Sequence, residues 1–418
     1  MPTTITARRL HTGTATIDYP VITIDAAGLI TGITSDPTSL ANEQDTLTAA
    51  FFDIHTHGAM GHDVMQSTPR ELSQIQRFLA QHGVAHYLPT TVTAPIDPTL
   101  RALENLANLI ESTPAEGEAQ PIGIHLEGPF LSHAKRGVHP PADLQPPSIA
   151  LFDRFQTAAR GHIKLVTIAP EPNAASGPAA NLGALPFAPF AKGGVSSEAR
   201  PLSSDTALDL IRHATSQGVR VSIGHTNATA AQTLPAIDSG ATSATHTFNA
   251  MRALDHREPG VLGTVLDDHR LYAELICDGV HVAPPLVRLW LKAKGLDRAI
   301  LVTDAMSAAG MPDGNYTLGN FTVTVTNGVA QLSADLNNGK STLAGSLLTM
   351  DRAVANLQTF TQASLADATR LASHNPAAML GQPTLTHLTP NAPANLNRFN
   401  PTGQLTATYL RGQRIPTP

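Results

Sequence analysis

Residues 51–58 read Phe51-Phe-Asp-Ile-His55-Thr-His57-Gly58, an apolar run that ends in two histidines one residue apart. Side chains alternate between the two faces of a β-strand, so His55 and His57 would point in the same direction. Neutral imidazoles that share a face in this way are a natural pair of metal ligands. We therefore expect a strand with a metal-binding pair at its C-terminal end. The alternative is two unrelated histidines at a strand end.

Four other β-like stretches also end in a polar side chain that suits a metal site. They end in Glu127, His225, His246 and Asp304. Taken singly, each has an ordinary interpretation as a solvated loop carboxylate, a hydrogen-bonded histidine or a helix N-cap. In a (β/α)8 barrel, however, the C-terminal ends of all strands ring one mouth, where such enzymes carry their sites. Together the five stretches predict one metal site, with His125 in a supporting place only.

The middle of the chain alternates helical and extended patterns. A capping box at Thr68 and a glycine at Gly83 delimit one predicted helix. Further helices are expected over 206–217, 228–238 and 286–294, each ended by a glycine and followed by a β-like run. Repeated units of this kind predict an α/β fold with a parallel sheet and outer helices. Their number fits a closed (β/α)8 TIM-like barrel better than an open sheet, although the sequence alone does not prove closure.

The two ends of the chain have β patterns instead. Runs at 20–25 and 29–33 flank a glycine turn, and residues 405–415 again alternate like strands. We expect a small β-sandwich domain built from both termini, residues 1–50 and 375–418, beside a barrel over 51–374. Two stretches interrupt the barrel pattern: a Pro/Ala-rich surface excursion at 173–204, and a hairpin within 315–339, with its turn at Asn327-Gly328, over one barrel end.

Composition excludes several classes of protein. The 418 residues are 42% hydrophobic and carry a net charge of −6, which gives no basic field for nucleic acid. The single cysteine, Cys277, rules out an intrachain disulfide. The first 19 residues lack a signal-peptide core, and no apolar run approaches the length of a membrane span. A cytoplasmic protein without nucleic-acid or membrane partners is expected.

The motifs around these residues resemble the N-acetylglucosamine-6-phosphate deacetylases of the amidohydrolase superfamily. The resemblance runs from about Phe51 to Pro376 and is highly specific. It is carried by His55-Thr-His57, His125-Leu-Glu-Gly-Pro-Phe130, Gly224-His-Thr226, Phe248-Asn-Ala-Met251, Arg257-Glu-Pro-Gly260, Asp278-Gly-Val-His281, Thr303-Asp-Ala305 and Leu343-Ala-Gly-Ser346. It implies hydrolysis of the acetamide of N-acetylglucosamine 6-phosphate to glucosamine 6-phosphate and acetate by metal-bound hydroxide.

The resemblance also assigns the metal ligands. Glu127, His225 and His246 would hold the main divalent ion, and His55 with His57 would hold a second one. Asp304 would contact the metal site and serve as catalytic base and acid, taking a proton from the attacking water and giving it to the leaving amine. One or two ions per subunit are expected. Zinc is the first choice, and iron, cobalt or manganese would also suit the ligands.

Substrate contacts are implied for five residues. His139 would touch the substrate and polarise the acetyl carbonyl, which makes it a second catalytic residue. Asn249, Ala250, Arg257 and His281 would contact the sugar or its phosphate, and a guanidinium suits a phosphate by charge and geometry. In the family the arginine comes from the neighbouring subunit, which implies a homodimer. A plain salt bridge of Arg257 with Asp255 or Glu258 is the alternative.

Several readings stay open. An N-acetylgalactosamine 6-phosphate deacetylase or another amidohydrolase is the runner-up. A cyclic-amide hydrolase is disfavoured because Lys164 stands at the start of its strand, not at the mouth. A non-catalytic sugar-phosphate sensor should have lost Asp304 or a ligand, and none is missing. The excursion at 173–204 and the stretch 390–396 depart from the family pattern but touch no predicted ligand.

Overall fold

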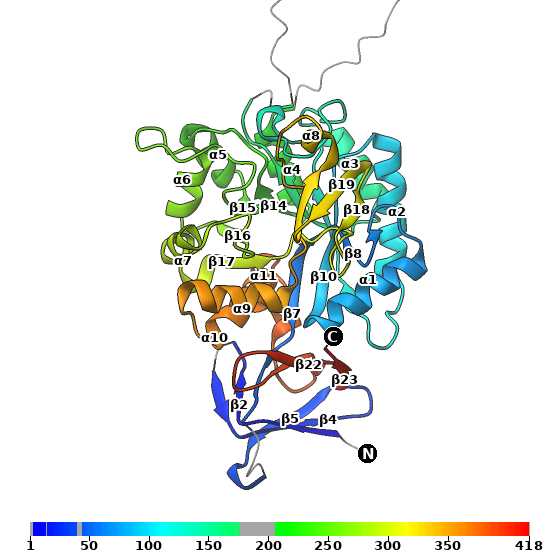
Figure 1. Ribbon diagram of the computed structural model, residues 1–418, viewed down its shortest axis with the longest axis vertical. Helices are drawn as coiled ribbons and strands as arrows, with labels where there is room; N and C mark the ends of the chain where they lie inside the picture. Colours follow the sequence, from blue (N-terminus) through cyan, green and yellow to red (C-terminus); the bar gives the residue numbers. More distant parts are fainter. Residues whose placement is uncertain (1–2, 14, 40–43, 173, 176–204, 418) are drawn as a thin grey trace, which may run out of the picture.

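The computed structural model describes residues 3–13, 15–39, 44–172, 174–175 and 205–417. The predicted surface excursion therefore lies almost wholly outside the described residues. Figure 1 shows a large α/β body with small β-sheets below it, and both chain ends lie among those lower sheets. Within the described residues, no helix is both long and apolar enough to cross a membrane.

The centre of the large body is a parallel barrel. Its described strands are β7 (Phe51–Thr56), β10 (Val84–Thr91), β12 (Ile124–Glu127), β13 (Ile163–Ile168), β14 (Arg220–Ile223), β15 (Ala241–Ala244), β16 (Tyr272–Ile276) and β17 (Ala299–Val302). Each pairs in parallel with the next, and the short β11 (Gln120–Pro121) adds to β10. Between the first and last strands, the Asp304 amide donates to the His55 carbonyl (2.9 Å), which nearly closes the barrel at its mouth.

Helices cover the outside of the barrel. They are α1 (Pro69–Gln81), α2 (Ile96–Glu111), α3 (Ile149–Ala158), α4 (Ala207–Ser216), α5 (Ala230–Asp238), α6 (Gly260–Asp267), α7 (Pro284–Arg298), α9 (Met350–Thr361), α10 (Leu365–Ala372) and α11 (His374–Met379). The capping box at Thr68 is confirmed, since Thr68 and Glu71 exchange hydrogen bonds. Gly295 has non-helical backbone angles (φ 65°) and ends the first helical segment of α7, as expected, and a second short segment beyond this kink reaches Arg298.

The terminal segments form two sheets with one common core. One sheet holds β1 (Thr3–Thr6), β4 (Pro20–Ile24) and β5 (Ile30–Ser35); the other holds β2 (Arg9–His11), β3 (Thr16–Asp18), β6 (Thr46–Ala49), β21 (Leu396–Phe399), β22 (Leu405–Leu410) and β23 (Gln413–Pro416). Their shared apolar cluster includes Leu10, Ile22, Leu47, Leu396 and Ala407. Both termini thus build this β unit, while domain limits at 50 and 375 stay a prediction.

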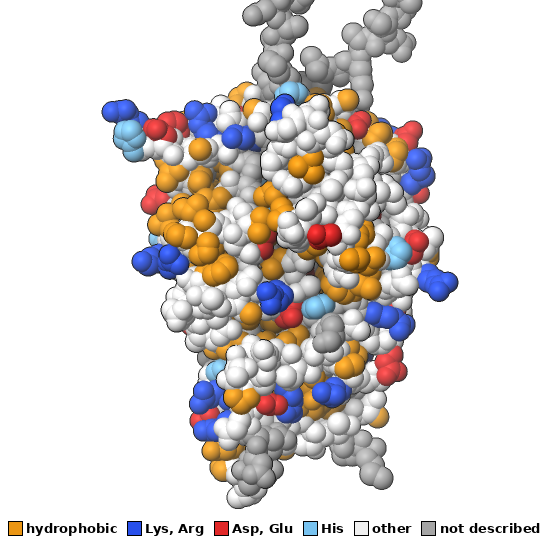
Figure 2. Space-filling view, viewed as in Figure 1, with side chains coloured by type: hydrophobic (Ala, Val, Ile, Leu, Met, Phe, Trp, Pro, Cys, Tyr) orange, Lys and Arg blue, Asp and Glu red, His pale blue; other side chains and the backbone are white. Residues whose placement is uncertain are grey.

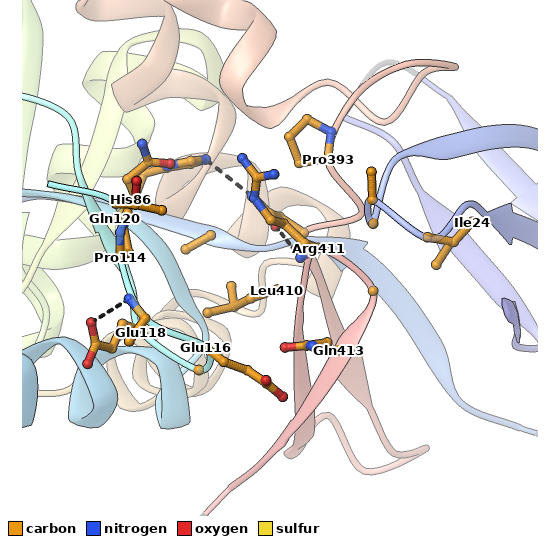
Figure 3. Close-up of a pocket in the computed structure, with 18 of the residues that line it drawn as sticks. Ile24, His86, Pro114, Glu116, Glu118, Gln120, Pro393, Leu410, Arg411 and Gln413 are labelled. Atoms are coloured by element: carbon orange, nitrogen blue, oxygen red, sulfur yellow. Dashed lines mark hydrogen bonds between the residues drawn. The ribbon is translucent and has the colours of Figure 1, made fainter. Parts of the chain in front are cut away.

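A cavity of about 600 Å³ separates the terminal sheets from the underside of the barrel. Figure 3 shows His86 and Gln120 on the barrel side, across from Arg411 and Pro393. The cavity lies at the N-terminal ends of the barrel strands and contains none of the predicted site residues. The mouth that concerns function is at the other end of the strands.

The predicted hairpin is present near that mouth. It consists of β18 (Gly314–Leu318), β19 (Phe321–Thr326) and β20 (Val329–Leu332), followed by the short α8 (Ser333–Leu336). Asn327 and Gly328 both have positive φ, as a tight hairpin turn requires. Val323 and Leu318 of the hairpin share an apolar cluster with Met306 and Val138. Because of this packing, the hairpin and the loop after it supply one wall of the mouth. The short pair β8 (Gly58–Ala59) and β9 (His62–Asp63) lies next to β7 in the chain.

A buried asparagine fixes the place where α7 meets β17. Asn375 donates its amide hydrogens to the carbonyls of Leu296 and Ala299, at 2.7 Å each. We expect Asn375→Ala to lower the free energy of unfolding by about 2–4 kcal/mol, since one buried and one part-buried carbonyl lose this hydrogen bond. Urea denaturation checks this. The matched control is Asn338→Ala, because exposed Asn338 also donates to a backbone carbonyl. A loss for Asn375→Ala no larger than for the control would contradict the assignment.

Candidate metal centre

Glu127 occupies the middle of the barrel mouth. It ends β12, is only 2% exposed, and divides its two oxygens between two groups of histidines. Its Oε1 lies 3.1 Å from His246 Nε2 and 3.3 Å from His225 Nε2. Its Oε2 lies 3.3 Å from His57 Nε2 and 3.5 Å from His55 Nε2. The predicted ligands therefore meet in one place, as two three-residue groups that share one carboxylate.

Asp304 faces the first-strand histidines from the other side. Its Oδ1 lies 3.1 Å from His57 Nε2 and 3.5 Å from His55 Nε2. Burial opposes the charged carboxylate, but His55 and His57 outweigh it and hold the pKa of Asp304 well below its usual range. Burial likewise opposes a charged His57, yet Asp304 and Glu127 raise its pKa to about 9. The carboxylates of Glu127 and Asp304 thus favour positive charge at the His55 and His57 rings, whether from a proton or from a metal ion.

The outer ring nitrogens show which atoms face the centre with a lone pair. His57 Nδ1 lies 3.0 Å from the Thr90 carbonyl, and His225 Nδ1 lies 3.0 Å from the Lys135 carbonyl. A carbonyl only accepts, so each Nδ1 must donate its hydrogen. Without a bound metal, a proton on Nε2 would face Glu127. In the neutral ring Nε2 carries a lone pair directed at Glu127 instead, and a cation between the two atoms would take the place of that proton.

The side chains at the barrel mouth have the composition and spacing of a metal site. The Nε2 atoms of His225 and His246 lie 3.1 Å apart with Glu127 beside both. His55 Nε2 is buried without a hydrogen-bond partner in the described residues. Imidazole and carboxylate are the ligands that zinc and similar divalent ions take, and rings held through Nδ1 are typical of such sites. The chain's own residues therefore fit a divalent cation, or two.

The backbone at the strand ends is strained where the ligands stand. His225, His246 and Asp304 all adopt left-handed φ values, of 47°, 27° and 50°. Such conformations cost about 1–3 kcal/mol each and persist where the surrounding fold enforces them. The residue before His225 must be Gly224, because a Cβ there would lie 2.6 Å from the Thr245 Cβ. The turns after the strands thus aim the side chains into the mouth.

A cavity of about 310 Å³ opens over these ligands. Among the predicted substrate residues, His139, Asn249, Ala250 and His281 line it. Arg257 does not. It is exposed on the loop before α6, and neither Asp255 nor Glu258 forms an ion pair with it among the described residues, since those carboxylates accept backbone amides instead. In a single chain the arginine stays outside the site.

His139 is set up to donate a hydrogen bond into the cavity. The Thr93 amide donates to its Nδ1 (3.2 Å), so this nitrogen is an acceptor and the proton of the neutral ring sits on Nε2. Burial and nearby His225 lower the pKa of His139, which favours the neutral ring. Its Nε2 lies 3.8 Å from Glu127 Oε2, at the edge of the ligand cluster. An Nε2–H donor in this position suits a substrate carbonyl.

Sequence reasoning missed two positioning residues. Thr93 fixes the tautomer of His139, and Glu274 contacts His55 Nδ1 at 3.3 Å. Glu274 had a signal, since it is the one charged residue within the β16 run Tyr-Ala-Glu-Leu-Ile. A carboxylate inside an apolar strand is costly unless something compensates it. His125, expected in a supporting place only, lies against the His55 ring, and its Nε2 lies 2.8 Å from the Thr167 hydroxyl.

The disfavoured lysine is far from the mouth. Lys164 Nζ donates to the Gly161 carbonyl (3.2 Å), at the N-terminal end of β13. It cannot bridge two ions at the C-terminal end of that strand. Glu127 already lies where a bridging carboxylate would be needed.

Relatives with known names share most of the chain. An N-acetylgalactosamine-6-phosphate deacetylase of Escherichia coli O157:H7 is 36% identical over 90% of this chain and 89% of its own. An N-acetylglucosamine-6-phosphate deacetylase of Bacillus subtilis (strain 168) is 35% identical over 82% of this chain and 77% of its own. The pattern of the amidohydrolase family matches residues 46–415.

Solved structures agree. A mutant of the Mycobacterium smegmatis N-acetyl-D-glucosamine-6-phosphate deacetylase, in complex with N-acetyl-D-glucosamine-6-phosphate, superposes with a TM-score of 0.84 at 31% identity over the whole of both chains. The N-acetylglucosamine-6-phosphate deacetylase of Thermotoga maritima gives 0.82 at 26% identity, again over both whole chains. The chain therefore belongs to the amidohydrolase family and is a hydrolase.

Proposed function

We propose that this chain hydrolyses the acetamide of N-acetyl-D-glucosamine 6-phosphate and releases D-glucosamine 6-phosphate and acetate. The observation that carries the proposal is the convergence of four histidine Nε2 atoms and two carboxylates at the floor of one cavity. Relatives named for this deacetylation support the substrate. A phosphorylated sugar of this kind is a substrate of the cytoplasm, where we expect the protein to act.

The ligand set would hold the metal in two groups. Glu127, His225 and His246 would bind the main divalent ion, and His55 and His57 would share Glu127 with a second. Zinc suits the set best, and iron, cobalt or manganese could replace it. When bound, such an ion lowers the pKa of water and polarises a carbonyl oxygen. The remaining chemistry belongs to the side chains around it.

Asp304 would move the proton. It is a carboxylate beside the ligand cluster and lines the cavity, so it can accept a proton from the attacking water. The amine of the sugar is a poor leaving group until it is protonated, and Asp304 is placed to return that proton. His139 Nε2–H would meanwhile donate to the acetyl carbonyl oxygen, where negative charge develops as water adds. Both groups line the same cavity.

The phosphate would be bound by a partner subunit. We infer a homodimer in which Arg257 of one subunit reaches the mouth of the other. Arg257 is exposed and unpaired in the described chain, and nearby Leu254, Val280, Leu286 and Leu289 are at least 40% exposed. Figure 2 shows hydrophobic side chains gathered over the region of α6 and α7. An interface on this side would cover them and bring the arginine to a second site.

The epimeric sugar is the second candidate substrate. The relative from Escherichia coli O157:H7 is named for N-acetylgalactosamine 6-phosphate and is as similar as those named for the glucosamine sugar. The two substrates differ in the orientation of one hydroxyl group, so only a few protein contacts would distinguish them.

Acetate release tests the proposed function directly. We expect release from N-acetylglucosamine 6-phosphate that is lost after chelation and restored by Zn²⁺, with slower turnover of the galactosamine epimer. Faster turnover of the galactosamine epimer would make N-acetylgalactosamine 6-phosphate the preferred substrate in place of the glucosamine sugar. No release from either sugar by the metal-loaded protein would contradict the proposal.

Asp304→Asn should keep metal and substrate binding but lower kcat by about 10²–10⁴-fold, because the amide can neither accept nor return the proton. Steady-state kinetics and metal analysis of the purified variant check this. A variant within a few-fold of wild-type kcat would remove the catalytic assignment.

Arg257→Ala should raise KM for the phosphorylated sugar far more than for unphosphorylated N-acetylglucosamine. Arg101→Ala is the control, since Arg101 is an exposed arginine of α2 away from the mouth. Equal changes for both sugars would refute the phosphate contact.

The activity of mixed dimers shows whether Arg257 serves the site of its own subunit or the site of the partner subunit. If Arg257 acts on the partner's site, random dimers of Arg257→Ala and Asp304→Asn subunits contain one complete site in each hybrid, which restores about a quarter of wild-type activity. If the arginine serves its own site, no site in the hybrid is complete and activity stays at the level of the separate variants.

A further inference from the structure

Glu274 is a buried carboxylate that the proposed chemistry does not use. It stands in the middle of β16, is 0% exposed, and lies inside the barrel below the ligands. Its Oε2 lies 3.3 Å from His55 Nδ1 and 3.4 Å from the backbone amide of His246. Its Oε1 has no hydrogen-bond partner among the described residues. A carboxylate buried with so little direct compensation needs positive charge close by.

The contact with His55 decides how that ring faces the centre. A carboxylate oxygen accepts, so Nδ1 of His55 donates to it and the neutral ring keeps its lone pair on Nε2. That Nε2 lies 3.5 Å from both Glu127 and Asp304 and makes no hydrogen bond of its own. The Glu274 carboxylate therefore lies on one side of the His55 ring, and the carboxylates of Glu127 and Asp304 lie on the other. This is the arrangement in which an outer carboxylate orients a ligating histidine and raises its basicity.

The other histidines lack such an anionic support. His57 and His225 donate to backbone carbonyls, and His246 Nδ1 has no partner in the described residues. Glu274 therefore acts on one of the two ligand groups, the one formed by His55, His57 and Glu127. Among the described residues, the hydrogen bond from the His246 amide (3.4 Å) is the one side-chain contact of Glu274 with the other group, and an uncharged acceptor could also make it.

We propose that Glu274 is a positioning residue that determines whether the second cation, at His55, His57 and Glu127, is retained. The proposal rests on the metal site of the proposed function. It adds a reason why the two ligand groups would differ in their affinity for a cation. Glu274 orients His55, and its charge offsets part of the positive charge that the second ion brings next to the first. Without it, the chain would keep one ion at Glu127, His225 and His246.

The test is a titration of the chelator-treated full-length protein with Co²⁺ and Zn²⁺, followed by calorimetry and by the visible spectrum of bound Co²⁺. Wild type should bind two ions per subunit. Glu274→Gln keeps the size and one acceptor but removes the charge, and we expect about 10–100-fold weaker binding of the second ion with the first unchanged. Glu118→Gln is the matched control, because Glu118 is also a buried carboxylate but lies beside the distant cavity of Figure 3.

A His55→Ala background shows whether Glu274 acts through His55. In that background Glu274→Gln should weaken the remaining metal binding by a smaller factor than it does with His55 present, since the ring it orients is gone and only its charge still acts. Thermal unfolding confirms that each variant is folded. If Glu274→Gln does not fold, Glu274→Asp withdraws the carboxylate by one methylene and should give the same selective loss.

Three results would overturn the inference: wild-type affinity for the second ion in Glu274→Gln, equal weakening of both ions, or a wild-type protein that binds only one. A protein that binds two ions, loses the second selectively in Glu274→Gln, and yet releases no acetate would refute the proposed substrate and leave the role of Glu274 intact.

Discussion

The electrostatics of Glu127 govern the functional end of this barrel. A carboxylate that is 2% exposed would be expelled from an apolar interior unless positive charge surrounded it. Four imidazoles and the carboxylate of Asp304 are gathered at this point, and the outer nitrogens of His57, His225 and His55 contact backbone carbonyls or Glu274. The barrel makes this possible because strands distant in sequence end at the same rim. The strained turns at His225, His246 and Asp304 follow from the same demand, since they aim the side chains inward.

The order of the chain explains why much of this could be predicted from sequence. Each predicted ligand lies within two residues of the C-terminal end of a buried strand, and period-two alternation places His55 and His57 on one face. The helix that starts after Thr68 and the hairpin at Asn327-Gly328 could also be predicted, because capping boxes and tight turns depend on local residue types. These features need no knowledge of the tertiary structure, only the assumption that the strands are parallel neighbours.

What could not be predicted depends on distant contacts. Glu274 is 219 residues from His55 in sequence, so its role shows only when the barrel closes and brings β16, on the far side of β17, close to β7. The tautomer of His139 depends on the Thr93 amide, which no residue-type pattern reveals. The walls of the cavity include Ser341 and Thr342, brought there by the hairpin that packs on Met306.

The central claim is that the lone pairs around Glu127 converge because a divalent cation belongs there. Anomalous X-ray scattering from crystals of Zn²⁺-loaded protein, recorded on both sides of the zinc edge, tests it most directly. The account predicts a peak bounded by Glu127, His225 and His246, about 2.0–2.1 Å from the histidine nitrogens. Crystals of Zn²⁺-treated protein with no anomalous peak in that space, and with these side chains unmoved, would contradict it.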